Sequence, residues 1–361
     1  SRDIRGRERV YFRGSNILQQ IVVGNSGLQV SAVGFGGIPI QRLGEEEAVR
    51  VVQHCLDLGI TYLDTAHGYT TSEERIGKAI AGRREGLVLA TKSHALDAET
   101  FCQEMETSFQ RLRVDYIDLY QFHGVSSMED LEKVLAPNGP LDAARAARDA
   151  GRIGHIGVTS HNLTVALELV KTGSFETLMF PFNFITVEPA EELIPLCRER
   201  GVGFIAMKPM GGGLLESATL AFKFLRQFPD IVPLVGIEKA HEIDEIVAIM
   251  AGPAALTAAE EAQIARLRQE LGTRFCRSCD YCQPCPQGIR ISTMLRLRSF
   301  AKRMPEARVF GEWGQEMVAI AETCADCGDC ESRCPYELPI REMLREHIAW
   351  YRERLAAYRP A

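Results

Sequence analysis

The chain has 361 residues, of which 46% are hydrophobic and 25% are charged, and its net charge is −7. This is the balance of an ordinary globular protein, long enough for one large barrel and a smaller unit, and the negative charge argues against nucleic acid as a partner. No apolar run approaches the ~20 residues of a membrane span and no signal peptide is recognisable, so we expect a cytoplasmic protein outside the membrane. The arginine-rich residues 1–15 are expected to form a flexible arm.

Strand-like and helix-like segments alternate along residues 16–256. Residues 20–30 alternate apolar and polar side chains around two glycines, which predicts a β-hairpin. Eight strand and helix pairs follow, and they predict an α/β fold of the (β/α)8 TIM barrel type. No Gly-x-Gly-x-x-Gly follows the first strand, so a Rossmann fold has little support. The expected strands are 31–37, 60–63, 86–91, 115–122, 153–159, 177–182, 202–207 and 231–236, and helices are expected at 45–58, 72–81, 98–112, 130–150 and 241–250.

Three successive strands end in residues that can carry acid–base chemistry. Asp64, Lys92 and His123 each follow one strand, and Tyr69 lies in the loop after Asp64. Taken alone, Asp64 could cap a helix and Tyr69 could be a half-buried loop phenol. In a parallel barrel, however, the carboxyl ends of the strands meet at one mouth, so the four side chains are expected to converge there.

Such a group could reduce a carbonyl. An ammonium beside a phenol stabilises the phenolate, so Lys92, held by Asp64, would make Tyr69 a proton donor to a carbonyl oxygen. His123 would orient that oxygen by a hydrogen bond. At these four residues the sequence resembles the aldo-keto reductase superfamily and its Asp, Tyr, Lys and His tetrad, over roughly residues 20–250. The resemblance implies NAD(P)(H) as cofactor and a small carbonyl or alcohol as substrate.

The resemblance also implies residues that hold the cofactor across the barrel mouth. Gly36 and Gly37 end the first strand there. Thr159 and Ser160 match the motif that holds the nicotinamide carboxamide.

Two positions depart from many relatives. Met179 stands in place of a glutamine that binds the carboxamide, and Met207 stands in place of an aromatic residue that stacks on the nicotinamide. Three glycines then follow the seventh strand, and a glycine loop lets backbone amides approach a pyrophosphate. Lys208, Gly211 and Gly213 are the candidates in this loop.

The residues after the eighth strand bear on the choice of dinucleotide. Gly236 and Glu242 occupy positions where relatives that prefer the phosphorylated cofactor often carry Lys and Arg. Loss of these cations removes the usual partners of a 2′-phosphate, although Lys239 or His241 could replace them. The sequence therefore favours NAD slightly over NADP.

Eight of the 11 cysteines fall in two runs near the carboxyl end. The spacing of the second run matches the bacterial ferredoxin motif, and the first is one residue short in its last gap. In two-cluster ferredoxins the fourth cysteine of each run ligates the other cluster. We therefore expect two [4Fe-4S] clusters, one held by Cys276, Cys279, Cys282 and Cys334, and the other by Cys324, Cys327, Cys330 and Cys285. Two structural zinc sites are the alternative.

These runs define a C-terminal domain. Residues 257–271 begin with a capping box of Thr257 and Glu260 and are expected to form a bridging helix. Residues 272–361 would form a mainly helical, ferredoxin-like dicluster domain. This ending resembles that of bacterial aldo-keto reductases with an appended iron–sulfur domain.

Three functions compete. The first is an enzyme that transfers hydride reversibly between a nicotinamide cofactor and a carbonyl or alcohol, with clusters that relay electrons to a redox partner protein. The second is an electron-transfer module, although nicotinamide gives two electrons together and a cluster takes one. The third is a redox or iron sensor built on a cofactor-binding barrel, against which the intact tetrad argues.

Overall fold

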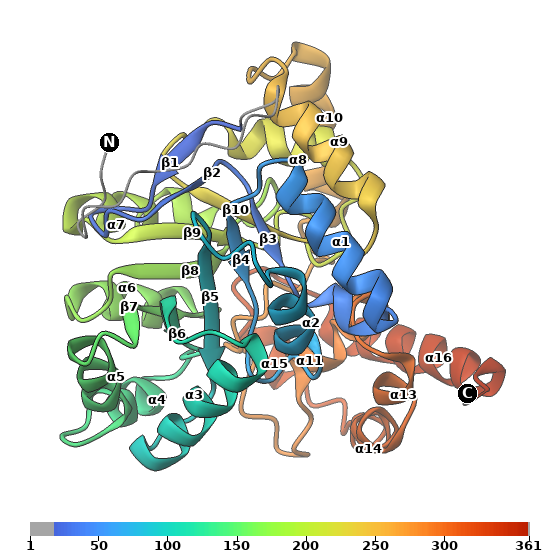
Figure 1. The fold of residues 1–361 in the computed structure, drawn as a ribbon. Helices are drawn as coiled ribbons and strands as arrows, with labels where there is room; N and C mark the ends of the chain where they lie inside the picture. The colour runs from blue at the N-terminus through green and yellow to red at the C-terminus, as the bar shows by residue number, and fades with distance from the viewer. Residues whose placement is uncertain (1–17, 360–361) are drawn as a thin grey trace.

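The computed structural model describes residues 18–359, so the predicted arm at residues 1–15 lies outside the described residues. Eight parallel strands close into a barrel in the order β10-β3-β4-β5-β6-β7-β8-β9, and this confirms the predicted TIM barrel (Figure 1). The strands are β3 Gly34–Gly36, β4 Tyr62–Asp64, β5 Val88–Ser93, β6 Ile117–Phe122, β7 Ile153–Thr159, β8 Thr177–Pro181, β9 Gly203–Met207 and β10 Val232–Gly236.

Helices follow the strands and cover the outside of the barrel. They are α1 Glu45–Asp57, α2 Ser72–Ala79, α3 Ala98–Leu112, α4 Met128–Leu135, α5 Pro140–Asp149, α6 Leu163–Lys171, α7 Leu193–Arg200, α8 Ala218–Leu225 and α9 Ala240–Ala251, with short 3-10 helices at Pro39–Arg42 and Glu188–Ala190. The predicted single helix at 130–150 is wrong, because α4 and α5 are separate. Pro137 lacks a backbone N–H and disfavours helical geometry at the residue before it, and Asn138 turns the chain with a φ of 57°.

The two-residue period of the strands sets which side chains point into the barrel. Tyr62 and Val88, near the starts of β4 and β5, belong to the hydrophobic cluster inside the barrel, whereas their neighbours Leu63 and Leu89 pack outward against the helices. Because alternate residues face the same side, Asp64 lies on the inward face of its strand, and Lys92 lies on the inward face of β5. The strand period thus directs the polar residues into the carboxyl end of the barrel.

The predicted hairpin closes the opposite end. β1 Gln20–Val22 pairs with β2 Gln29–Ser31 in antiparallel fashion. Val23 and Val30 are buried against the same interior cluster that contains Tyr62 and Val88. The end where the strands begin is therefore plugged by apolar side chains, and the end where they finish carries the polar ones.

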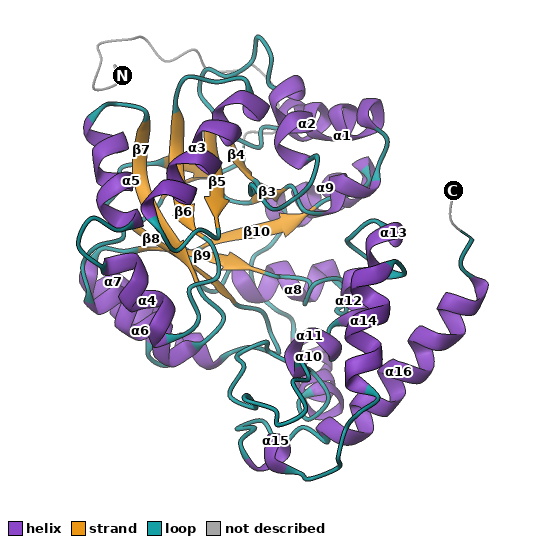
Figure 2. Ribbon diagram, turned by 90° about the horizontal axis from the view of Figure 1, so that it is seen from below, coloured by secondary structure: helices purple, strands orange, loops and turns teal. Residues whose placement is uncertain are grey.

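The segment after the barrel forms two parts. Helix α10 Ala258–Leu271 packs on the barrel through buried Ile264, and its capping box of Thr257 and Glu260 is present. A second hydrophobic core starts at Cys282 and includes Met294, Val318 and Tyr351. Around this core lie α11 Ile291–Met294, α12 Leu297–Ala301, α13 Glu306–Val309, α14 Glu312–Ala321, α15 Asp329–Ser332 and α16 Ile340–Ala357 (Figure 2). Within residues 18–359 no helix is both long and apolar enough to cross a membrane.

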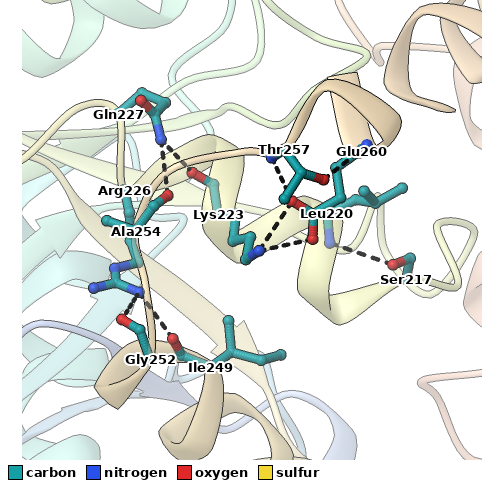
Figure 3. A network of polar contacts seen from close by, with 10 residues as sticks. All are labelled: Ser217, Leu220, Lys223, Arg226, Gln227, Ile249, Gly252, Ala254, Thr257 and Glu260. Carbon is teal, nitrogen blue, oxygen red and sulfur yellow. Dashed lines mark hydrogen bonds and ion pairs between the residues drawn. The ribbon is translucent and has the colours of Figure 1, made fainter. Parts of the chain in front are cut away.

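A polar network holds α10 and the linker before it against the barrel (Figure 3). The Lys223 ammonium of α8 donates to both carboxylate oxygens of Glu260, at 2.7 and 2.9 Å. Arg226 donates to the carbonyls of Ile249 and Gly252, both at 2.9 Å. Helix α10, expected as a bridge, is thereby fixed as an outer layer of the barrel, and the change to the second core comes after it.

The C-terminal domain docks on the loops at the carboxyl ends of the strands. Asn162, after β7, donates to the Cys279 carbonyl at 3.0 Å. Ser299 donates to the Gly212 carbonyl and Lys302 donates to the Gly213 carbonyl, each at 2.7 Å. In Figure 1 the hairpin and the C-terminal helices accordingly lie at opposite ends of the barrel. The domain that carries the cysteines is therefore a neighbour of the polar end of the barrel.

Gly212 provides a test of this docking. It has a φ of +70°, and a Cβ built on it would lie 2.6 Å from the Ser299 hydroxyl oxygen. Gly173 has a similar φ of +65° but nothing within 4 Å of its Cβ position. We expect Gly173→Ala to reduce stability by about 1 kcal/mol through backbone strain, and Gly212→Ala to reduce it by about 1–3 kcal/mol more through overpacking. Thermal unfolding of both variants, prepared anaerobically, measures the difference, and equal melting temperatures would contradict the contact.

Candidate active site and cysteine sites

The predicted tetrad comes together at the carboxyl end of the barrel. The Lys92 ammonium donates to Asp64 Oδ1 at 2.5 Å and also to the Thr65 carbonyl. The same ammonium lies 5.0 Å from the centroid of the Tyr69 ring. The Tyr69 ring in turn meets the His123 ring edge to face, with 5.6 Å between centroids. Lys92 therefore lies between a carboxyl group and a phenol.

Burial controls the charges of this group. Asp64 and Lys92 are 2% and 1% exposed. Burial opposes the charge on Lys92, but Asp64, followed by Tyr69, outweighs it and raises the pKa of the ammonium. Burial raises the pKa of Asp64, and Lys92 and Gln121 limit the rise. Lys92 is thus held as an ammonium beside the Asp64 carboxyl in a place that water scarcely reaches.

Gln121 is a member of the site that the sequence analysis did not identify. It lies on β6, two residues before His123, so the strand period directs it inward. Its side-chain amide donates to Asp64 Oδ2 at 2.9 Å, and Lys92 occupies the other oxygen of the same carboxylate. Asp64 is therefore oriented from both sides.

His94 is a second residue that the sequence analysis missed. Its ring stacks on that of His123 with 3.8 Å between centroids, and its Nδ1 lies 2.7 Å from the His123 carbonyl. Burial, followed by the charges of His94 and Lys92, holds the pKa of His123 well below its usual range. His123 is therefore a neutral imidazole, and its buried Nδ1 has no partner among the described residues.

The cysteines surround two separate cavities in the C-terminal domain. One cavity, of about 220 Å³, is lined by Cys285 together with Cys324, Cys327 and Cys330. The other, of about 20 Å³, is lined by Cys334 together with Cys276, Cys279 and Cys282. The last cysteine of each run therefore lies with the first three of the other run. Four thiols around a space are the donor set of a four-iron cluster.

The chain is similar to known proteins over both parts. Residues 32–223 match the model of the aldo/keto reductase family, which is more than half of the chain. The chain belongs to the aldo/keto reductase family. Residues 275–339 match the model of a 4Fe-4S dicluster domain, which supports iron–sulfur clusters over the zinc alternative at the cysteines. The predicted combination of an aldo-keto reductase barrel and an iron–sulfur domain is thus confirmed.

Individual relatives match the barrel of this aldo/keto reductase. An uncharacterized oxidoreductase of Bacillus subtilis, YqkF, is 31% identical over 55% of this chain and 67% of its own length. An L-galactose dehydrogenase of Arabidopsis thaliana is 30% identical over 54% of this chain and 66% of its own length. The chain therefore spans about two thirds of the length of these relatives. Among solved structures, the holo form of aldo-keto reductase AKR11C1 from Bacillus halodurans is 26% identical with a TM-score of 0.61, over 69% of this chain and 96% of that one.

The residues expected around the cofactor have structural contacts of their own in this aldo/keto reductase. Gly36 and Gly37 allow close packing, since a Cβ on them would lie 3.1 Å from the Val235 carbonyl oxygen and 2.6 Å from the Ser72 hydroxyl oxygen. The Thr159 hydroxyl accepts a bond of 2.7 Å from the backbone N–H of Gly124, the residue after His123. Thr159 thereby positions the loop that carries His123.

Ser160 and His123 are the polar side chains beside Thr159 at this end of the barrel. Ser160 is buried, and its hydroxyl accepts from the Asn162 backbone N–H at 3.3 Å, donates to the Asn162 carbonyl at 3.3 Å and lies 3.5 Å from the Ser126 hydroxyl. His123 Nδ1 is buried and without a partner among residues 18–359. Met207 is half-buried at the end of β9, whereas Met179 is buried inside the barrel. Of the residues expected at the nicotinamide, Met207 is thus partly accessible, whereas Ser160 and Met179 are buried.

The glycine loop differs from the amide cradle that the sequence suggested. The N–H groups of Gly211 and Gly213 donate to the carbonyls of Lys208 and Met210, both at 2.9 Å. The carbonyls of Gly212 and Gly213 accept from the C-terminal domain, and a Cβ on Gly211 would lie 3.0 Å from the Phe275 ring. The three glycines thus permit positive φ angles and close packing between the domains.

The residues after β10 have a structural explanation as well. Glu242 accepts from the backbone N–H groups of Glu238 and Lys239, at 2.8 and 2.9 Å, and so caps helix α9. Lys239 is exposed, and a Cβ on Gly236 would lie 2.8 Å from Pro39. The Glu242 carboxylate therefore bonds to backbone N–H groups at the start of the helix, where a negative charge also complements the helix dipole.

Proposed function

We propose that the protein is an NAD(P)-dependent aldo-keto reductase that transfers hydride reversibly between the nicotinamide and a small carbonyl or alcohol. The observation that carries this proposal is the Lys92 ammonium, which bonds to Asp64 at 2.5 Å and lies 5.0 Å from the centre of the Tyr69 ring. Family membership supports an oxidoreductase. A bound nicotinamide would supply the hydride.

The residues of the chain supply the proton and its control. Tyr69 would give its proton to the carbonyl oxygen, because the Lys92 ammonium stabilises the phenolate that remains. Asp64 fixes Lys92, and Gln121 fixes Asp64. His123, neutral because of its burial, would donate a single hydrogen bond to the same oxygen without competing as an acid. Lys92 and His123 would therefore stabilise the negative charge that develops on Tyr69 and on the carbonyl oxygen during the reaction.

Gln121→Met tests the support of the carboxylate. The change keeps the size of the side chain but removes the hydrogen bond to Asp64 Oδ2, which favours the ionised carboxyl, so the pKa of Asp64 should rise. Activity that depends on the carboxylate should then be lost at a higher pH as the solution is acidified, and kcat at neutral pH should fall about 10- to 100-fold, as for the loss of a hydrogen bond to a charge. Rates measured from pH 5 to 9 show the shift. An unchanged acid limb would contradict the role of Gln121.

We propose that the two cysteine sets hold two [4Fe-4S] clusters. Bound clusters would supply one-electron transfer. Cys324 and Cys327 are exposed, so the set around the larger cavity faces the surface. The set with Cys276 faces the barrel, because the Asn162 amide bonds to the Cys279 carbonyl. The outer set would thus exchange electrons with a redox partner protein, and the inner set would lie next to the barrel mouth.

Anaerobic purification tests the function as a whole. Iron and sulfide analysis should give about eight of each per chain, as two four-iron clusters require. Fluorescence titration should give a Kd for NADH that is comparable to or lower than the Kd for NADPH, to within about tenfold. The reason is that Gly236 and Glu242 stand where other residues would supply the cations that hold a 2′-phosphate. If neither NADH nor NADPH bound, the proposal of an NAD(P)-dependent enzyme would be refuted.

The visible spectrum tests the electron relay. Bleaching of the clusters on addition of NADH would support the relay, and an unchanged spectrum would oppose it.

A further inference from the structure

Three cations gather where the C-terminal domain meets the barrel mouth. Lys208 follows β9, and its ammonium donates to His161 Nε2 at 2.7 Å. Arg296 and Arg303 flank helix α12 of the C-terminal domain and pack near the Phe300 ring, at 5.1 and 5.9 Å. A Cβ on Gly212 would lie 3.4 Å from Arg303 Cζ, so this guanidinium covers the loop after β9. All three side chains are half-buried.

Arg303 is also close to the proton donor of the tetrad. The Gln41 amide donates to the Arg303 carbonyl at 3.4 Å, and Gln41 Oε1 accepts from the hydroxyl of Thr70 at 3.0 Å. Thr70 is the residue after Tyr69. Burial, followed by the charge of Arg296, lowers the pKa of Arg303 to about 10, and Tyr69 acts in the opposite direction. Arg303 of the second domain therefore lies beside the loop that carries Tyr69.

The cations have no carboxylate partner. Among residues 18–359, no Asp or Glu forms an ion pair with Lys208, Arg296 or Arg303. Burial, followed by the charges of Arg296 and Arg303, lowers the pKa of Lys208 well below its usual range, and burial also lowers the pKa of Arg296. The charges of Cys276 and Asp280 oppose both shifts. The groups that act on Arg303 are instead the repulsive charge of Arg296 and the phenol of Tyr69. A partly desolvated guanidinium beside another cation is unfavourable until an anion joins it.

We propose that Arg303, supported by Arg296 and Lys208, binds the carboxylate or phosphate group of an anionic carbonyl substrate. The inference rests on the proposed function, because Tyr69 defines where the carbonyl oxygen lies. Arginine suits such oxyanions, since its planar fork donates two parallel hydrogen bonds. The C-terminal domain would then have a second task besides holding clusters, namely the selection of the substrate.

Matched substrates and a matched variant test this. Succinic semialdehyde carries a carboxylate where 4-methylpentanal carries an isopropyl group of the same shape, and glyceraldehyde 3-phosphate is compared with glyceraldehyde. Arg303→Met is compared with Arg298→Met, which removes an exposed arginine of helix α12 that packs on Trp350 at 5.7 Å. Loss of a hydrogen bond to a charge should lower kcat/KM about 10- to 100-fold, through KM. We expect that loss for one anionic aldehyde in Arg303→Met, with the neutral partners changed less than about threefold and Arg298→Met unaffected.

The other outcomes are also decisive. Equal losses for charged and neutral aldehydes would overturn the proposal. A weaker Kd for NADH or NADPH in Arg303→Met, with unchanged discrimination between aldehydes, would overturn it and assign the cations to cofactor phosphates. If the wild-type holoenzyme reduced none of the four aldehydes, the proposed function would fail by itself. Calorimetric titration with succinate and with inorganic phosphate would then decide: binding lost in Arg303→Met alone supports the anion site, and no binding to the wild type overturns it.

Discussion

Replacing Tyr69 by phenylalanine is expected to lower carbonyl reduction by about 100- to 10,000-fold, the range that a positioned acid contributes. The phenol would give up its proton during the reaction, so its loss affects the transition state more than the bound state. Dinucleotide binding should therefore stay within about threefold of the wild type. Single-turnover reduction of 4-methylpentanal and a fluorescence titration with NADH measure the two effects separately.

Tyr62→Phe is the matched control. Tyr62 begins the strand that ends at Asp64, it is 1% exposed, and its buried hydroxyl has no hydrogen-bond partner among the described residues. Removing an unsatisfied buried hydroxyl should be neutral or slightly stabilising, and activity should persist. If Tyr69→Phe retained most of the wild-type kcat, or if both variants lost activity equally, Tyr69 would not be the acid.

The tetrad was predictable because its signals are local. Asp64, Lys92 and His123 stand at the ends of apolar runs, and the barrel brings strand ends together whatever the details of packing. Gln121 and His94 have a weaker signal: the two-residue strand period puts them on the same face as His123 and Lys92, but it does not say which partner they bond to. The barrel register places Gln121 opposite Lys92, and the hydrogen bond to Asp64 Oδ2 shows that it faces the carboxyl group.

Contacts between the domains could not be derived from the sequence. The glycines after β9 suggested a phosphate loop, because a run of glycines permits positive φ angles and the close approach of another group. The pattern does not identify that group. In the structure the close neighbours are Phe275 and Ser299. Likewise, Arg303 reaches the barrel mouth from more than 200 residues beyond Tyr69, and no spacing rule links them. Long-range partners of this kind depend on how the second core is oriented on the first.

The crossing of the cysteine runs has a pairwise test with large effects. Because Cys334 lines the cavity of Cys276, Cys279 and Cys282, Cys334→Ala should remove about four of the eight iron atoms. Alanine is chosen since it offers no oxygen ligand in place of sulfur. Cys285→Ala should remove a similar amount from the other cavity, which it shares with Cys324, Cys327 and Cys330.

Double variants decide which cysteines share a cluster. Cys276→Ala combined with Cys334→Ala should lose no more iron than either single variant, because both changes damage the same site. Cys324→Ala combined with Cys334→Ala should lose nearly all eight atoms, because each change damages a different site. Uncrossed runs predict the reverse, since Cys324 and Cys334 would then share one cluster. Iron analysis of anaerobic preparations, with electron paramagnetic resonance after reduction, separates the two patterns, and near-complete iron loss in the Cys276 and Cys334 pair would overturn the crossing.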